Sequence, residues 1–266
     1  YYIDKSGLIT DILKNEATKV TLFTRPRRFG KSMAMSMLAS FFDIEKDSMI
    51  MFDGLKVAKN NKMLCEKWMN QCPVIFLSFK DVDGRTFENA FELLKFTIAQ
   101  FCDAHAWLEN SEKVTDAQKE NYKRLKNGTA SMIDVQTSLC ILIKMMHAHY
   151  DRKVILLLDE YDVPIAKASA KGYYAEMLDV VKGLMQALKD NDALRFAVVT
   201  GCLRIAKESI FTGTNNFVSD TISSSHLNEY FGFTQADVDQ LLKDADCLEH
   251  AADIKNWYDG YHFGDL

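Results

Sequence analysis

The residues best suited to bind phosphate lie in the sequence RPRRFGKS, residues 25–32. A glycine lets backbone N–H groups approach phosphate oxygens, a lysine reaches the β- and γ-phosphates, and a serine hydroxyl can bind Mg²⁺. Gly30, Lys31 and Ser32 offer these three groups in consecutive positions. A short apolar run precedes the loop and a helix-like run follows it, which is the strand, loop and helix order of a phosphate-binding loop.

The loop departs from the usual pattern G-x-x-x-x-G-K-[ST] at Arg25, where glycine is expected. On its own, the sequence Gly30-Lys31-Ser32 also describes the polar start of a helix, so a second motif is needed. Pro26 has a restricted φ and favours extended geometry at Arg25, so we expect a rebuilt loop in which Arg25 avoids positive φ. The expected nucleotide-binding residues are Arg25, Pro26, Arg27, Arg28, Phe29, Gly30, Lys31 and Ser32.

A second motif follows the most apolar run in the chain, residues 154–158, which leads directly to Asp159 and Glu160. A continuous apolar run is typical of a central strand that is covered on both faces. We expect Asp159 to hold Mg²⁺ through water together with Ser32, and Glu160 to orient and polarise the attacking water. In the alternative interpretation the acidic residues cap the next helix, a role that also suits Asp162.

Apolar strands that alternate with amphipathic helices predict an α/β fold, in which a parallel sheet has right-handed crossovers. The predicted strands are 20–23, 72–79, 154–158 and 194–199, the predicted helices are 4–16, 31–42, 86–106, 132–150, 173–190 and 235–245, and 109–130 is a surface helical excursion. In helix 31–42 the expected buried residues are Met33, Met37, Leu38, Phe41 and Phe42. The phosphate loop and the Asp-Glu pair both follow strands, at the edge where open α/β sheets bind ligands.

Composition divides the chain into two regions. Residues 1–204 form the predicted core, a three-layer α/β/α P-loop NTPase with a mainly parallel sheet, and residues 205–266 form a mostly helical C-terminal region. Polar loops begin near residue 205, and the aromatic, glycine-rich end IKNWYDGYHFGDL has no obvious closing element. We therefore expect the sequence to stop before a further domain.

The extra strand between the loop and the Asp-Glu pair resembles the division of P-loop proteins that has an additional strand and a catalytic glutamate. In that division a polar residue at the end of the next strand senses the γ-phosphate, and Thr200 occupies this position. P-loop switches often receive an arginine in cis or in trans, and Arg204 is the candidate in cis. An alternative, structural role for Arg204 is an ion pair with Asp162 or Glu208.

Long segments over nearly the whole chain carry a resemblance to one family: YYIDKSGLI, LFTRPRRFGKS, FDGLKV, PVIFLSFKD, LLLDEYDVPI, GYYAEM, TGCLRIAKESIFTGTNNF, EYFGFT and WYDGYHFG. They resemble the bacterial AAA-ATPase-like family, which is similar to archaeal-type and STAND-like ATPases. The resemblance implies ATP and Mg²⁺ as ligands, and it makes the arginine-rich loop with Arg25 a family trait. It also implies a C-terminal nuclease-like domain of the PD-(D/E)XK type outside these 266 residues.

Composition narrows the functional classes. The chain has 48% hydrophobic and 26% charged residues and a net charge of −5, which argues against nucleic-acid binding even though Arg25, Arg27 and Arg28 lie close together. No apolar run reaches the roughly 18 residues of a membrane helix. Six widely spaced cysteines lack metal-ligand spacing, and we expect them to be reduced in the cytoplasm.

Two functional hypotheses follow. In the first, the chain is an ATP-hydrolysing switch module that controls an attached nuclease-like domain or a partner domain, as the intact Lys31, Ser32, Asp159 and Glu160 favour. In the second, it is a non-hydrolysing nucleotide-binding or protein-interaction module with a degenerate loop, which Arg25 favours. A homo-oligomer is compatible with either hypothesis.

Overall fold

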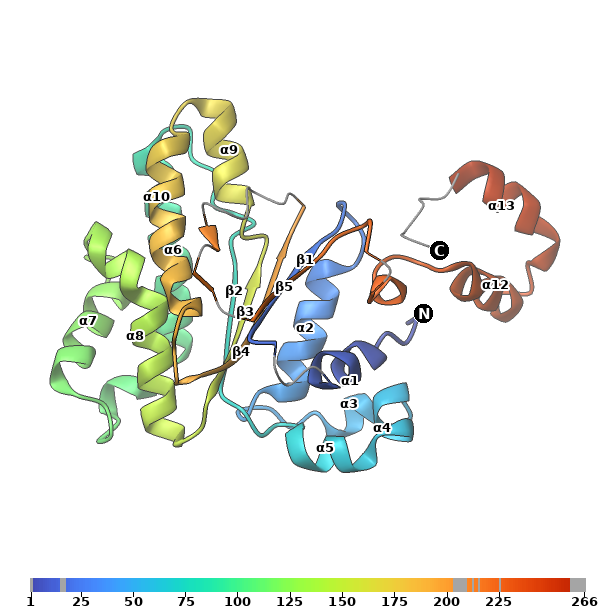
Figure 1. Ribbon diagram of the computed structural model, residues 1–266, viewed down its shortest axis with the longest axis horizontal. Helices are drawn as coiled ribbons and strands as arrows, with labels where there is room; N and C mark the ends of the chain where they lie inside the picture. The colour runs from blue at the N-terminus through green and yellow to red at the C-terminus, as the bar shows by residue number, and fades with distance from the viewer. Residues whose placement is uncertain are drawn as a thin grey trace.

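A five-stranded, all-parallel sheet forms the centre of the molecule in the computed structural model (Figure 1). The structure describes residues 2–14, 18–202, 210–211, 213–214, 216–224 and 226–258. The strands are β1 (Val20–Thr24), β2 (Val74–Ser78), β3 (Val154–Asp159), β4 (Leu194–Gly201) and β5 (Phe217–Asp220). Their order across the sheet is β2-β3-β4-β1-β5, so β4 separates the strands that carry the two sequence motifs.

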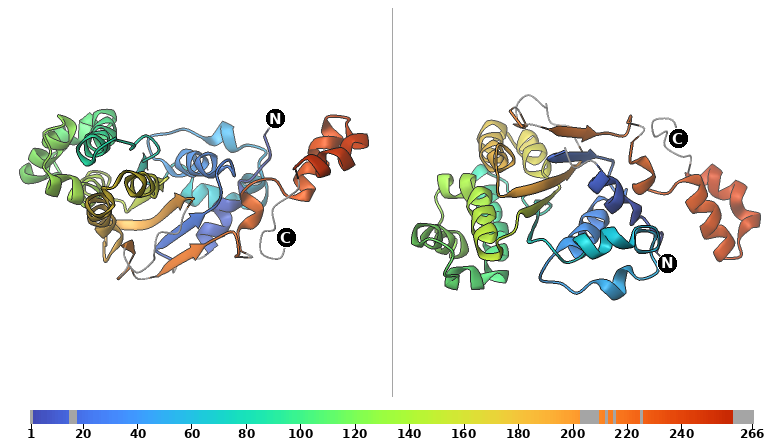
Figure 2. Two further views of the ribbon diagram at one scale, coloured as in Figure 1. Left: turned by 90° about the horizontal axis from the view of Figure 1, so that it is seen from above. Right: turned by 60° about the horizontal axis from the view of Figure 1, so that its bottom comes forward.

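Helices cover both faces of the sheet (Figures 1 and 2). One face is covered by α1 (Gly7–Lys14), α2 (Lys31–Phe42), α3 (Met49–Phe52), α4 (Lys56–Asn60) and α5 (Lys62–Trp68). The other face is covered by α6 (Phe87–Ala104), α8 (Met132–Tyr150), α9 (Val163–Lys171) and α10 (Tyr174–Met185), with α7 (Asp116–Lys126) packed on α6 and α8. The predicted three-layer α/β/α architecture is confirmed.

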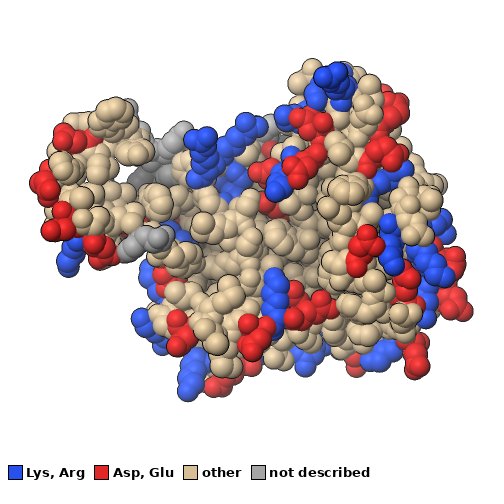
Figure 3. Space-filling model, turned by 180° about the vertical axis from the view of Figure 1, so that it is seen from behind, with Lys and Arg blue, Asp and Glu red and all other residues tan. Residues whose placement is uncertain are grey.

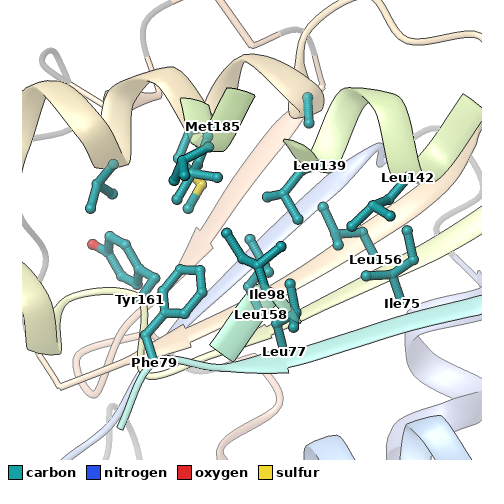
Figure 4. Packing of buried hydrophobic residues seen from close by; sticks show 14 of the residues in the cluster. Ile75, Leu77, Phe79, Ile98, Leu139, Leu142, Leu156, Leu158, Tyr161 and Met185 are labelled. Atoms are coloured by element: carbon teal, nitrogen blue, oxygen red, sulfur yellow. The ribbon is translucent and has the colours of Figure 1, made fainter. Parts of the chain in front are cut away.

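The apolar run of β3 lies in the middle of this arrangement because its side chains alternate between the two faces. Leu156 and Leu158 belong to the core on the α6 and α8 face, and Ile155 and Leu157 belong to the core on the α2 face. Figure 4 shows Leu156 and Leu158 packed near Leu139 of α8. A strand buried on both faces needs apolar residues at every position, which explains the continuous run.

Capping residues set several helix boundaries. Thr86 caps α6, Ser131 caps α8 and Thr234 caps α12 (Gln235–Asp244), in each case by accepting a hydrogen bond from the third residue of the helix. The predicted helix 132–150 matches α8, and 86–106 matches α6 closely. The predicted helix 173–190 is α10 followed by a short 3₁₀ turn, η2 (Gln186–Leu188). The polar region 43–72, for which no helix is predicted, contains the short helices α3, α4 and α5.

The buried face of α2 differs from the prediction at Met33. This side chain is 64% exposed, whereas Met35, which was not on the predicted face, is fully buried. Lys31 and Met35 are four residues apart and share the helix face that lies on the sheet. Met33 lies two positions from both and points away from that face, so the prediction for Met33 is wrong.

The sheet also contains a strand that the sequence analysis placed in a polar loop. β5 pairs in parallel with β1, with Phe23 opposite Asp220. It is four residues long, and only Asp220 is fully buried, so it lacks the apolar run that marks an inner strand. The sheet therefore continues beyond the boundary predicted at residue 204.

The C-terminal helices α12 and α13 (Ala251–Tyr258) project from the side of the sheet where β1 and β5 lie (Figures 1 and 2). The 3₁₀ turns η3 (Asn228–Tyr230) and η4 (Leu248–His250) precede α12 and α13 respectively. In the described part of the chain, no helix is long and apolar enough to span a membrane.

Candidate functional site

The phosphate-loop sequence connects β1 to α2 at the carboxyl edge of the sheet. Gly30 has a φ of 77° and precedes the first residue of α2, and Arg28 has a φ of 68°. Arg25 is not among the described residues with positive φ, in agreement with the rebuilt loop expected from Pro26. The loop thus leads into the amino end of a 12-residue helix, where the helix dipole and backbone N–H groups favour an anion.

Lys31 lies over the loop and is only 5% exposed. Its ammonium group donates to the carbonyl oxygens of Arg25 at 2.9 Å and Pro26 at 2.8 Å. It also lies 3.4 Å from the sulfur of Cys202, at the end of β4. The lysine is therefore held where the carboxyl ends of β1 and β4 meet, although its present hydrogen bonds are to the main chain of its own loop.

Asp159 joins three elements at the same edge. Its carboxylate is 2% exposed; Oδ2 accepts a 2.6 Å hydrogen bond from the Ser32 hydroxyl, and Oδ1 accepts a hydrogen bond from the Thr200 hydroxyl. Ser32 comes from α2, Asp159 from β3 and Thr200 from β4. The structure therefore brings together residues that the sequence separates by 127 and 41 positions.

This group of side chains fits a magnesium ion better than a transition metal. A carboxylate and a hydroxyl are hard oxygen donors, and Mg²⁺ in nucleotide sites is held by one or two such groups together with waters and phosphate oxygens. In the described residues no group of three or more His, Cys, Asp and Glu is placed to hold a metal. Ser32 and Asp159 would supply the protein ligands.

Glu160 directly follows β3 and has a φ of 55°, a left-handed conformation that is uncommon for a residue with a side chain. Its N–H lies 3.4 Å from the Thr200 hydroxyl oxygen, and the next N–H, that of Tyr161, donates to the Thr200 carbonyl at 3.1 Å. Burial raises the pKa of Glu160 above its ordinary value, and the Asp159 carboxylate adds to this effect. Lys31 and Arg27 oppose the rise in pKa, so both cations lie near the carboxylate.

The raised pKa of Glu160 gives a prediction for stability. When the folded pKa exceeds the unfolded pKa, the cost of ionising the group appears as pH rises from the unfolded to the folded pKa, and it is complete above the folded pKa. We expect Glu160→Gln to raise the melting temperature at about pH 7 and to lose this advantage near pH 4, as thermal unfolding at both pH values would show.

Glu120→Gln provides the control for this stability measurement. The hydrogen bond from Lys123 lowers the pKa of Glu120 on α7, so this substitution should give no stabilisation at neutral pH. An equal gain in melting temperature for both variants would contradict the assignment to Glu160.

The other predicted site residues differ in exposure and in the direction of their side chains. Arg27 and Arg28 are exposed residues of the loop, and Phe29 and Pro26 are partly buried. The Arg25 side chain turns away from Lys31 to Asp220 and is 1% exposed, while its main chain stays in the loop. Arg204 lies outside the described residues.

Two residues near the loop were missed by the sequence analysis. Asp220 and Asn228 both accept hydrogen bonds from Arg25, but they lie in the polar region after residue 205, which has no apolar periodicity. Gly201 was also not singled out. A Cβ there would come within 2.6 Å of the Asp162 carboxylate and 2.8 Å of the Tyr161 ring, so glycine allows the close approach of β4 to the segment after β3.

Together, the parallel sheet, the Gly-Lys-Ser sequence at the start of α2 and the Asp-Glu pair at the end of β3 define the class of P-loop-like α/β/α proteins. The family model described as predicted AAA-ATPase matches residues 1–211, and the chain belongs to this family.

One relative is an "uncharacterized protein in vnfD 5′ region" of Azotobacter chroococcum mcd 1. It is 30% identical over 265 residues, and the match covers 99% of this chain and 45% of the relative, so the chain spans less than half of the relative's length. No solved structure matches the chain.

Proposed function

We propose that this chain binds ATP together with Mg²⁺ at the carboxyl edge of the sheet and hydrolyses the γ-phosphate. The observation that carries the proposal is the 2.6 Å hydrogen bond from Ser32 to Asp159, because it joins the phosphate loop to the acidic strand end. A serine and an aspartate in this relation are the protein ligands that P-loop enzymes use for Mg²⁺. Membership of a family of predicted AAA-ATPases supports the same activity.

The proposal gives each of these side chains a defined role. Lys31 binds the β- and γ-phosphates and exchanges its main-chain hydrogen bonds for phosphate oxygens. Glu160 orients a water and accepts its proton, a task that the raised pKa favours by bringing the group closer to neutral pH. Thr200 fixes the Asp159 carboxylate and senses the γ-phosphate. Mg²⁺ would neutralise charge on the phosphate oxygens.

Calorimetric titration of ATP with and without Mg²⁺ tests the binding step. We expect Lys31→Ala to weaken ATP binding by about 10- to 100-fold, because a charge-assisted hydrogen bond to phosphate has no replacement in a methyl group. Lys153→Ala is the matched control, since Lys153 is exposed just before β3, at the opposite edge of the sheet. Equal ATP affinity in the Lys31→Ala and Lys153→Ala proteins would overturn the site assignment.

The competing function is a nucleotide-binding or protein-interaction module that does not hydrolyse ATP. It is favoured by the Arg25 side chain, which is engaged away from Lys31, and by the Lys31 ammonium group, which is bound to loop carbonyls. Binding without turnover would support this second function. The control of a nuclease-like or other attached domain belongs to the first function, because a hydrolysis cycle can drive a switch.

The distribution of surface charge bears on nucleic-acid binding, and the state of the cysteines bears on the location of the protein in the cell. On the face shown in Figure 3, Lys and Arg side chains are interspersed with Asp and Glu, so the described residues of this face form no continuous basic surface of the kind that tracks a nucleic-acid backbone. Cysteines at all six positions are free, and burial raises the pKa of Cys72 to about 11 and of Cys102 to about 12. Free thiols support our proposal of a reducing, cytoplasmic location.

A further inference from the structure

The phosphate loop is attached at both ends to one segment from much later in the chain. We call this the β5–η3 segment and define it as residues 217–224 and 226–232. At the first end of the loop, the Arg25 side chain enters this segment. At the second end, the Phe29 carbonyl oxygen accepts a 3.1 Å hydrogen bond from the N–H of Gly232. A Cβ on Gly232 would lie 2.9 Å from the Phe29 ring, so the two chains are in close contact.

Both Nη atoms of the Arg25 guanidinium group are engaged within this contact, whereas Nε is buried and has no hydrogen-bond partner among the described residues. Nη1 donates to the carbonyl oxygens of Thr24 and Asp220, both at 3.0 Å. Nη2 donates to the Asp220 carboxylate and, at 2.8 Å, to the Asn228 side-chain oxygen, and the group lies 5.0 Å from the centre of the Phe231 ring. Four acceptors match the four N–H bonds at Nη1 and Nη2, so this group cannot reach a phosphate without losing buried partners.

The main chain of Arg25 leads in the opposite direction, to the lysine of the site. Its carbonyl oxygen accepts a hydrogen bond from the Lys31 ammonium group at 2.9 Å. A phosphate bound by Lys31 would compete with this carbonyl for the ammonium group. The side-chain anchor at Asp220 and Asn228 holds the Arg25 main chain in place while Lys31 exchanges this carbonyl for phosphate, so an intact anchor favours the loop geometry that binds nucleotide.

We propose that Arg25 is a positioning residue that couples nucleotide binding at the loop to the packing of the β5–η3 segment. The inference rests on the proposed ATP site. It adds that nucleotide binding at this site changes the packing of the β5–η3 segment through Arg25. Binding free energies are reciprocal: if nucleotide stabilises the segment against the loop, then loosening the segment weakens nucleotide binding by the same factor.

The β5–η3 segment continues directly into the C-terminal helices. Thr234 caps α12, and Asp237 in the first turn of that helix forms a 2.5 Å ion pair with Lys5. Lys5 also donates to the Glu229 carbonyl at 2.6 Å, which joins η3 and α12 at one side chain. A change at the loop would therefore reach α12 through a continuous set of contacts.

Hydrogen exchange on the 266-residue chain tests the coupling. A non-hydrolysable ATP analogue with Mg²⁺ should slow amide exchange at residues 25–32 and, by about 5-fold or more, in the β5–η3 segment. Arg25→Lys keeps the charge but loses the planar fork, so it should reduce the response of the segment and weaken analogue binding about 5-fold or more. Arg195→Lys is the matched control, because Arg195 stacks on Trp68 and touches neither the loop nor the segment in the interactions described.

A double variant separates coupling from stability. Arg25→Met with Asp220→Leu replaces the buried pair by apolar side chains and should recover stability that Arg25→Met alone loses, while the response of the segment stays absent. Analogue binding that protects residues 25–32 but leaves wild-type exchange in the segment unchanged would overturn the coupling and leave the ATP site intact. Variants at Arg25 that lower only the melting temperature, with wild-type affinity and exchange response, would reduce Arg25 to a structural role. No binding of the analogue by wild type would instead overturn the proposed function.

Discussion

Glu160→Gln is expected to retain ATP·Mg²⁺ binding and to lower ATP hydrolysis by about 10²- to 10⁴-fold. The amide preserves the shape of the side chain and can still accept a hydrogen bond from water, but it cannot take a proton at neutral pH. In the wild-type protein, burial and the Asp159 carboxylate raise the pKa of Glu160. Turnover should therefore fall as pH falls through this raised pKa, and the residual turnover of Glu160→Gln should lack that dependence. Calorimetry for binding and phosphate release for turnover measure the two effects separately.

Glu120→Gln makes the same chemical change on the peripheral helix α7, where the carboxylate pairs with Lys123. Its turnover should equal that of wild type. Equal turnover in wild type and Glu160→Gln would show that Glu160 is a structural residue at the end of β3. Loss of binding together with turnover would show that the carboxylate supports the loop rather than the chemistry.

The motif-bearing parts of the fold were predictable from the sequence because local pattern and tertiary role agree there. The apolar run 154–158 identifies a doubly covered strand, and its last residues identify the edge at which Asp159 and Glu160 lie. Helix α8 was predictable at both ends because Ser131 and Asp134 form a capping box at its start, and the apolar pattern continues to its end. The boundaries of such elements can be predicted from the residues in and next to them.

The position of the Arg25 side chain was not predictable in this way. Its partner Asp220 lies 195 residues away, on an edge strand too short and too exposed to show a pattern. The backbone geometry of Arg25 could be inferred from its neighbour Pro26, because that constraint is local. Arg25 was expected at the nucleotide because arginines suit the charge of a triphosphate, and its distant carboxylate partner leaves no local signal in the sequence. Long-range ion pairs of this kind become visible only when the sheet order is known.

The left-handed residue of the loop was also not predictable from the sequence. Arg25 avoids positive φ, but Arg28 adopts a φ of 68°. For a residue with a side chain this conformation costs about 1–2 kcal/mol, so the surrounding loop must hold it in place. The usual glycine pattern places the left-handed residue of a standard loop at position 25. The sequence alone does not show that in this loop Arg28, three residues later, has the left-handed conformation.

The isolated chain should hydrolyse ATP slowly until an arginine completes the site. P-loop switches leave part of the transition-state charge uncompensated, and an arginine supplied in cis or in trans adds about 10³- to 10⁵-fold in rate. Arg204 is the candidate from sequence, and among described residues Arg27 is an exposed arginine near enough to lower the pKa of Glu160. If either acts in cis, its replacement by alanine should lower turnover far more than ATP affinity.

An arginine from a second copy of the chain would instead make specific activity rise with protein concentration, because the complete site would form only in an assembly. Phosphate release measured over a wide range of protein concentration distinguishes this case from the two cis cases. Arg195→Ala serves as the control, since its side chain stacks on Trp68 away from the loop. Fast turnover that is independent of concentration and unchanged by Arg204→Ala and Arg27→Ala would exclude all three versions, because the site would then need no further positive charge.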